Sequence, residues 1–119
     1  MRPATNRRCL IACLTLAASV AAGPPAQAGS VSACKPIKNP YAGTRYDGVD
    51  ITKIQARGAS CRGARRVARG AHRKALGITP PPSGIRRFTW RGWRVTGNLR
   101  GDSDRYLATR SGRRIRWIF

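Results

Sequence analysis

The chain has almost no acidic side chains. Its 119 residues include no glutamate and only four aspartates, against 24 lysines and arginines, so its formal net charge is +20. With one histidine and no glutamate, an ordinary zinc or calcium site lacks ligands. No nucleophile motif, phosphate-binding loop or cofactor fingerprint is present. The sequence therefore predicts no metal, no cofactor and no catalytic residue, whereas its charge favours attraction to polyanions.

No apolar run is long enough to span a membrane. Basic residues near the start precede an apolar run of about thirteen residues, whereas a span requires about twenty. Ala26 and Ala28 then provide the small residues of a cleavage site. We therefore expect residues 1–28 to be a secretory signal peptide and residues 29–119 to form a single small secreted domain.

Only two cysteines, Cys34 and Cys61, follow the predicted signal peptide. In a small exported domain, two cysteines indicate a disulfide rather than a metal pair or a nucleophile. A bridge that closes a loop of this length stabilises the fold by roughly 3 to 4 kcal/mol on a chain-entropy estimate.

One segment predicts a helix that begins after Ser60 and ends at Gly77. Serine is a favoured N-cap, and glycine is a common stop. Small residues recur at helical spacing and predict a narrow buried stripe. They are Cys61, Ala64, Ala68, Ala71 and Ala75. Four arginines fall opposite this stripe, and we expect them to be exposed together. They are Arg62, Arg66, Arg69 and Arg73.

The rest of the chain indicates strands and turns. Residues 30–46 are turn-rich and predict an irregular arm held by Cys34. The alternating segments predict strands at 49–56, 88–95, 105–110 and 113–119, the second bulged at Gly92 and the last two joined at Ser111-Gly112. The expected fold is α+β: one helix packed on a small antiparallel sheet of about four strands, with one disulfide.

Three segments resemble those of a known group of proteins. They are Gly-Ala-Ser-Cys-Arg-Gly-Ala-Arg-Arg-Val-Ala at 58–68, Gly92-Trp93, and the arginine-rich closing strand. Over roughly residues 34–119 the chain resembles a large group of small secreted actinobacterial proteins of unknown function. The resemblance implies export, a disulfide and this fold, but no activity. Members of that group usually have a second cysteine pair, and Val95 and Ala108 stand at the matching positions here. We expect an apolar contact between them.

The residues that suggest catalysis also have simpler roles. His72 lies at the edge of the predicted buried stripe, with no carboxylate near it in sequence, so a structural or surface role is favoured over acid–base catalysis. Two aspartate pairs could serve hydrolysis or metal binding, but they lie in turn-like segments where aspartate bonds to the backbone. These pairs are Asp47 with Asp50 and Asp102 with Asp104.

Three tryptophans alternate with arginines near the end of the chain. Trp90, Trp93 and Trp117 could form a stacking platform for bases or glycans. Their inward position in the predicted strands favours a core role beneath the helix instead. The arginines would then form a second basic face on the sheet. They are Arg87, Arg91, Arg94, Arg114 and Arg116.

Two hypotheses about function remain. In the first, the protein is not an enzyme but a secreted, disulfide-stabilised basic domain. Its helix arginines bind an acidic cell-wall polymer, an acidic polysaccharide or extracellular nucleic acid, unless the charge serves solubility alone. In the second, it is a small secreted hydrolase or toxin, ribonuclease-like, in which His72 acts with arginines on a phosphate.

Overall fold

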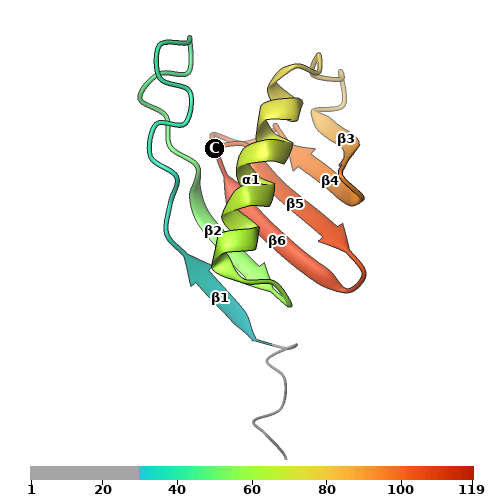
Figure 1. The fold of residues 1–119 in the computed structure, drawn as a ribbon. Coiled ribbons are helices and arrows are strands. Elements are labelled where there is room, and N and C mark those ends of the chain that lie inside the picture. The colour runs from blue at the N-terminus through green and yellow to red at the C-terminus, as the bar shows by residue number, and fades with distance from the viewer. Residues whose placement is uncertain (1–29) are drawn as a thin grey trace, which may run out of the picture.

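The fold is a six-stranded antiparallel sheet with one helix across one of its faces (Figure 1). It is seen in a computed structural model that describes residues 30–119. The predicted signal peptide and the first residue after it, Gly29, lie outside the described residues. The strand order across the sheet is β1-β2-β6-β5-β4-β3. The elements are β1 (Val31–Cys34), β2 (Thr52–Arg57), α1 (Cys61–Leu76), β3 (Ile85–Trp90), β4 (Trp93–Asn98), β5 (Arg105–Arg110) and β6 (Arg113–Ile118).

The prediction of about four strands is wrong, because the sheet has six. One of the two additional strands is β1, which lies in the segment expected to be an irregular arm. Its four residues pair with β2, from Val31 opposite Arg57 to Cys34 opposite Ile54. All but Cys34 are exposed, so no alternation of apolar and polar residues marks the strand in the sequence.

The other additional strand arises because a hairpin occupies the segment in which the sequence predicts one bulged strand, 88–95. Arg91 and Gly92 form a two-residue turn between β3 and β4, with φ of 45° and 80°, as expected for the hairpin turn that suits the twist of a sheet. Trp90 and Trp93 are paired directly across this turn. Residues paired in this way point to the same side of a sheet, so a tight hairpin produces the same inward pattern as a bulge.

The closing hairpin is confirmed. Strands β5 and β6 meet at Ser111 and Gly112, which both have positive φ, and β6 also pairs with β2. Val95 and Ala108 lie directly opposite each other on β4 and β5, and both are buried. The two positions expected to share an apolar contact are therefore cross-strand neighbours in the core.

Helix α1 follows the prediction closely. Ser60 is the N-cap and its hydroxyl accepts a hydrogen bond from Gly63 N at 3.1 Å, while Gly77 is the C-cap. The four alanines of the predicted stripe are fully buried, and Cys61 is half-buried. Val67 and His72 extend the buried face. Because its inner face is made mostly of alanine, the helix lies close to the sheet.

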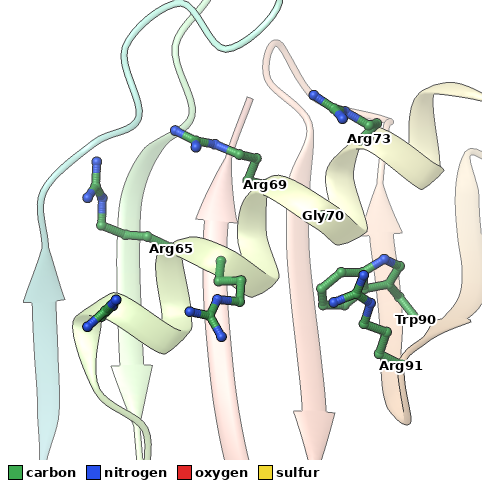
Figure 2. A pocket seen from close by; sticks show the side chains of 8 residues that line it. Arg65, Arg69, Gly70, Arg73, Trp90 and Arg91 are labelled. Carbon is green, nitrogen blue, oxygen red and sulfur yellow. The ribbon is translucent and has the colours of Figure 1, made fainter.

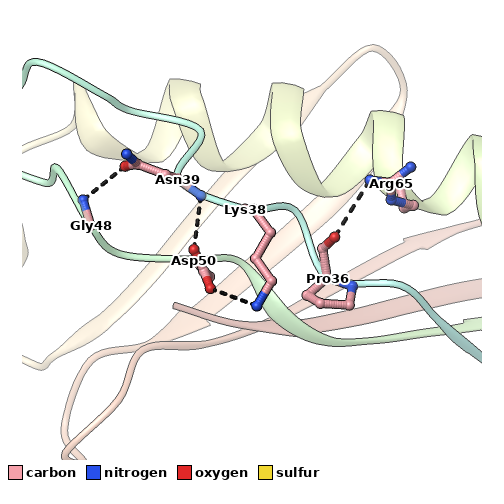
Figure 3. A network of polar contacts seen from close by, with 6 residues as sticks. All are labelled: Pro36, Lys38, Asn39, Gly48, Asp50 and Arg65. Carbon is pink, nitrogen blue, oxygen red and sulfur yellow. Dashed lines mark hydrogen bonds and ion pairs between the residues drawn. The ribbon is translucent and has the colours of Figure 1, made fainter.

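The arm between β1 and β2 is held by polar contacts (Figure 3). Asp50 accepts hydrogen bonds from Asn39 N at 2.8 Å and Lys38 Nζ at 3.2 Å, and Asn39 Oδ1 accepts one from Gly48 N at 2.8 Å. Asp47 accepts from Asn39 Nδ2 and Gly43 N. These donors lower the pKa of both carboxyls, led by Gly43 N at Asp47 and by Asn39 N at Asp50. The expected turn role of this aspartate pair is confirmed.

The disulfide between Cys34 and Cys61 is confirmed. It joins the last residue of β1 to the first residue of α1, with the two Cα atoms 5.3 Å apart. The bridge therefore fastens the outermost strand of the sheet to the start of the helix.

Replacing both cysteines with alanine should lower the free energy of unfolding by about 2 to 5 kcal/mol. The two positions are 27 residues apart in sequence, and without the bridge the segment between them is no longer held as a closed loop in the unfolded chain. Urea denaturation followed by tryptophan fluorescence measures this change. The parent protein under reducing conditions is the control, and its free energy of unfolding should equal that of the variant. A double variant as stable as the oxidised parent would contradict the prediction.

Candidate polyanion-binding site

A hollow of about 360 Å³ opens beside α1 and is lined almost entirely by arginines (Figure 2). Gly70 of the helix and Trp90 of β3 complete its lining. No aspartate is among the lining residues. The arginines are Arg62, Arg65, Arg66, Arg69, Arg73 and Arg91. We call this region the helix-face hollow.

Trp90 lies against the helix at Gly70. A Cβ atom at position 70 would fall 2.1 Å from Trp90 Cζ2, far inside van der Waals contact. Glycine in a helix interior costs about 0.5–1 kcal/mol relative to alanine, so its presence is explained by this close approach. Arg91 lies over the Trp90 ring, with its Cζ 4.9 Å from the ring centroid, and its carbonyl accepts a hydrogen bond from Arg110 Nη1 at 3.2 Å. The guanidinium of Arg91 is thus held in place on an aromatic surface.

The charges of the hollow repel one another. Three pairs of its arginines are four residues apart on α1, and each like-charge pair at that spacing destabilises a helix by about 0.2–0.5 kcal/mol. The pairs are Arg62 with Arg66, Arg65 with Arg69, and Arg69 with Arg73. The first turn of α1 also contains no acidic residue to complement the positive end of the helix dipole. An anion in the hollow would relieve both effects.

The four helix arginines predicted from the sequence are all exposed, and all four line the hollow. Their role in binding stays a prediction. The other four lining residues, Arg65, Gly70, Trp90 and Arg91, were not in this predicted set. Gly70 is marked only by being a glycine inside a helix, which signals a close approach without naming the partner. Arg65 is half-buried and donates to Pro36 O at 3.4 Å (Figure 3), and Arg91 was expected on the sheet.

The second predicted set of arginines is divided by the structure. Arg87, Arg94, Arg114 and Arg116 project from the sheet face that is turned away from α1. Arg91 does not, because it occupies the β3–β4 turn and reaches the helix-face hollow. Trp93 and Trp117 are buried as expected. Trp90 is only half-buried, so the expectation that all three tryptophans fill the core holds for two of them.

His72 is fully buried beneath the helix. Its Nδ1 is 2.6 Å from the hydroxyl oxygen of Tyr41, and its ring contacts those of Tyr106 and Phe119. Burial, and next the charge of Arg86, lower the pKa of His72 from 6.5 to about 4. Burial also raises the pKa of Tyr41 to about 12. The imidazole is therefore neutral at physiological pH and ties the arm to the core.

Arg86 is a buried cation in the same region. It is 5% exposed and donates to Tyr106 Oη at 3.1 Å and to Ile78 O at 2.9 Å. Both acceptors are uncharged. A second positive charge beside it would be costly, which adds to the larger effect of burial in keeping His72 neutral.

Within residues 30–119 the structure has no group of three or more metal-ligating side chains, and none of the described helices is both long and apolar enough to cross a membrane. No protein-family model, no curated protein and no solved structure matches the chain.

Replacing Gly70 with alanine should displace Trp90, because the added methyl group overlaps the ring. We expect a loss of about 1–3 kcal/mol in the free energy of unfolding and a change in tryptophan fluorescence. Gly77→Ala is the matched control, since its φ is −85° and its added Cβ comes no closer than 3.5 Å to Lys74 O. If both variants are equally stable, Trp90 does not depend on Gly70.

Stability should fall as the pH is lowered from about 6.5 to about 4. In this window the unfolded chain protonates His72 and the folded chain does not, so the full stabilisation is present above pH 6.5 and up to about 3 kcal/mol is lost by pH 4. Asp47 and Asp50 contribute further losses only near and below pH 3.8. Urea denaturation at a series of pH values measures the profile.

His72→Gln is the control variant for this profile, because its amide oxygen can still accept from Tyr41 Oη. It should be less stable at neutral pH and lose the fall between pH 6.5 and 4. Parallel profiles in parent and variant would show that His72 does not cause the fall.

Proposed function

We propose that this protein binds linear phosphate polymers through the helix-face hollow. The observation that carries the proposal is the gathering of six arginines, and no acidic residue, around one hollow. An arginine guanidinium presents planar N–H donors that match the oxygens of a phosphate group. Binding to such a polymer would be driven by the release of its counterions.

The pair formed by Trp90 and Arg91 supports the proposal. A guanidinium that lies over an aromatic ring keeps its in-plane donors available, and it loses less freedom when it binds an anion. The repulsion among the helix arginines adds to the argument, because a bound polyanion would offset it. Solubility alone would not require the arginines to surround a hollow.

We further propose that the protein acts outside the cell. The disulfide between Cys34 and Cys61 supports the predicted export, because disulfides persist in oxidising compartments. The polymers concerned would then be cell-wall or extracellular polyanions.

The alternative, a ribonuclease-like enzyme that uses His72, finds little support in the geometry. The imidazole is fully buried and 2.6 Å from Tyr41 Oη, and its pKa is about 4. A general base must reach its substrate, and its pKa should lie near the working pH. The helix-face hollow is lined by neither histidine nor aspartate.

Binding to poly(glycerol phosphate) should weaken steeply with salt, with log K falling by about 0.7–0.9 per unit of log salt concentration for each phosphate neutralised. The triple variant Arg66→Gln, Arg69→Gln, Arg73→Gln should show a flatter slope. All three side chains are exposed, so the fold should be preserved. Titration calorimetry at several salt concentrations measures both slopes, and circular dichroism checks the fold.

The control variant removes the same charge elsewhere: Lys35→Gln, Lys38→Gln, Arg45→Gln, three exposed residues of the arm that do not line the hollow. Its slope should stay close to that of the parent. Equal slopes in the two triple variants would show that net charge, not the hollow, governs binding. A parent protein without salt-dependent binding would end the proposal.

A further inference from the structure

The sheet face turned away from α1 is the second strongly basic surface of the molecule. Among residues 30–119 no helix or strand covers it, since the only helix of this part lies on the opposite face. We call it the open face. No aspartate belongs to its strands. Its basic residues are Lys53, Arg57, Arg87, Arg94, Arg105, Arg114 and Arg116.

The strand register places these charges in rows across the sheet. In one row Arg57 lies opposite Arg114, and Arg114 lies opposite Thr109, which lies opposite Arg94. In the next row, successive pairings lead from Arg116 through Leu107 and Thr96 to Arg87. Adjacent strands are about 4.8 Å apart, so Arg114 and Arg94 are separated by about 10 Å and Arg116 and Arg87 by about 15 Å. Thr109 lies between the first pair, and Leu107 and Thr96 lie between the second. Such rows can follow an extended, negatively charged chain.

The open face is also hollowed. A depression of about 440 Å³ is lined by three basic residues, Lys53, Arg105 and Arg116. The remaining lining is polar at Gln55, Thr96 and Asn98 and apolar or aromatic at Tyr106, Leu107, Trp117 and Ile118. Lys53 sits at the β2 bulge with φ of 48°, a conformation that non-glycine residues rarely adopt. The bulge lets Ile51 and Ile54 both face the core while Lys53 lines the depression.

The kind of ligand follows from what the open face lacks. None of its outward side chains is aromatic, because Tyr106 and Trp117, which border the depression, are only 3% and 1% exposed. Trp90 in the helix-face hollow is already engaged by Gly70 and Arg91. Single-stranded nucleic acids gain much of their affinity from bases that stack on aromatic rings. Rows of arginine without rings fit a phosphodiester chain that carries no bases, such as a polyol phosphate.

We propose that the open face binds a second polyol-phosphate chain, so that one molecule bridges two chains. This inference rests on the proposed function, because the first chain occupies the helix-face hollow. The helix and the open face lie on opposite sides of the sheet, so one short chain cannot reach both surfaces. Bridging then joins separate polymer chains without any contact between protein molecules.

The test uses short poly(glycerol phosphate) chains, one batch labelled with a donor dye and the other with an acceptor dye. The parent should bind two chains per molecule in titration calorimetry and give energy transfer between dyes, which falls again at excess protein. The open-face variant is Arg87→Gln, Arg94→Gln, Arg116→Gln, three exposed residues. It should bind one chain and give no transfer, as should the triple variant of the helix-face hollow. The arm variant should behave as the parent does.

The outcomes separate the two proposals. One chain per parent molecule, or an open-face variant that matches the arm variant, overturns bridging and leaves the helix-face hollow as a single site. If the helix-face variant binds as many chains as the arm variant and energy transfer is lost only in the open-face variant, the helix-face hollow is not a binding site. Bridging by these two surfaces is then also overturned. A dT oligonucleotide that binds two per molecule and displaces poly(glycerol phosphate) from the open face would contradict the choice of a base-free chain.

Discussion

Four alanine methyl groups set the distance between α1 and the sheet. Because Ala64, Ala68, Ala71 and Ala75 are fully buried, no longer side chain can occupy these positions without lifting the helix. The arginines of α1 must therefore project outward or sideways, and the exposed surface of the helix becomes basic by necessity. The same close packing brings the helix backbone near β3, which is why position 70 is a glycine and why Trp90 can lie against it.

Positive charge extends into the interior, where the hydrogen bonds of the buried cation go to neutral acceptors and the charge of Asp104 acts on it without a hydrogen bond. Arg86 is bound to a tyrosine hydroxyl and a carbonyl, and His72 beside it stays uncharged. The four aspartates lie in loops, and two of them hold the arm in shape. Asp47 and Asp50 thus serve local backbone structure, and neither of them offsets the charge of the two basic surfaces. This arrangement raises self-repulsion in the free protein and lowers it in a complex.

The sequence was most informative where a local rule acted alone. Ser60, the alanine spacing and Gly77 predicted the helix, Cys34 and Cys61 the bridge, and Ser111-Gly112 the closing hairpin. The predicted number of strands was wrong where two different structures give the same pattern of inward residues. A two-residue turn at Gly92 and a bulge at Gly92 both place Trp90 and Trp93 inward. The exposure of the helix arginines was predictable, because it depends on helical spacing alone. Arg91 and Gly70 join that surface through tertiary contacts that no local pattern records.

The bridge between Cys34 and Cys61 also has a consequence for association between molecules. Strand β1 is short, lies at the edge of the sheet and leaves Val31 56% exposed, so few contacts besides its pairing with β2 hold it. If the bridge were reduced and β1 detached, the backbone groups of β2 would become an unpaired edge, ready to pair with a strand of another copy. The disulfide therefore also keeps β2 paired with β1, so that the edge of β2 is not available to another copy. The protection matters most where copies of the protein are concentrated, because strand pairing between molecules depends on how often they meet.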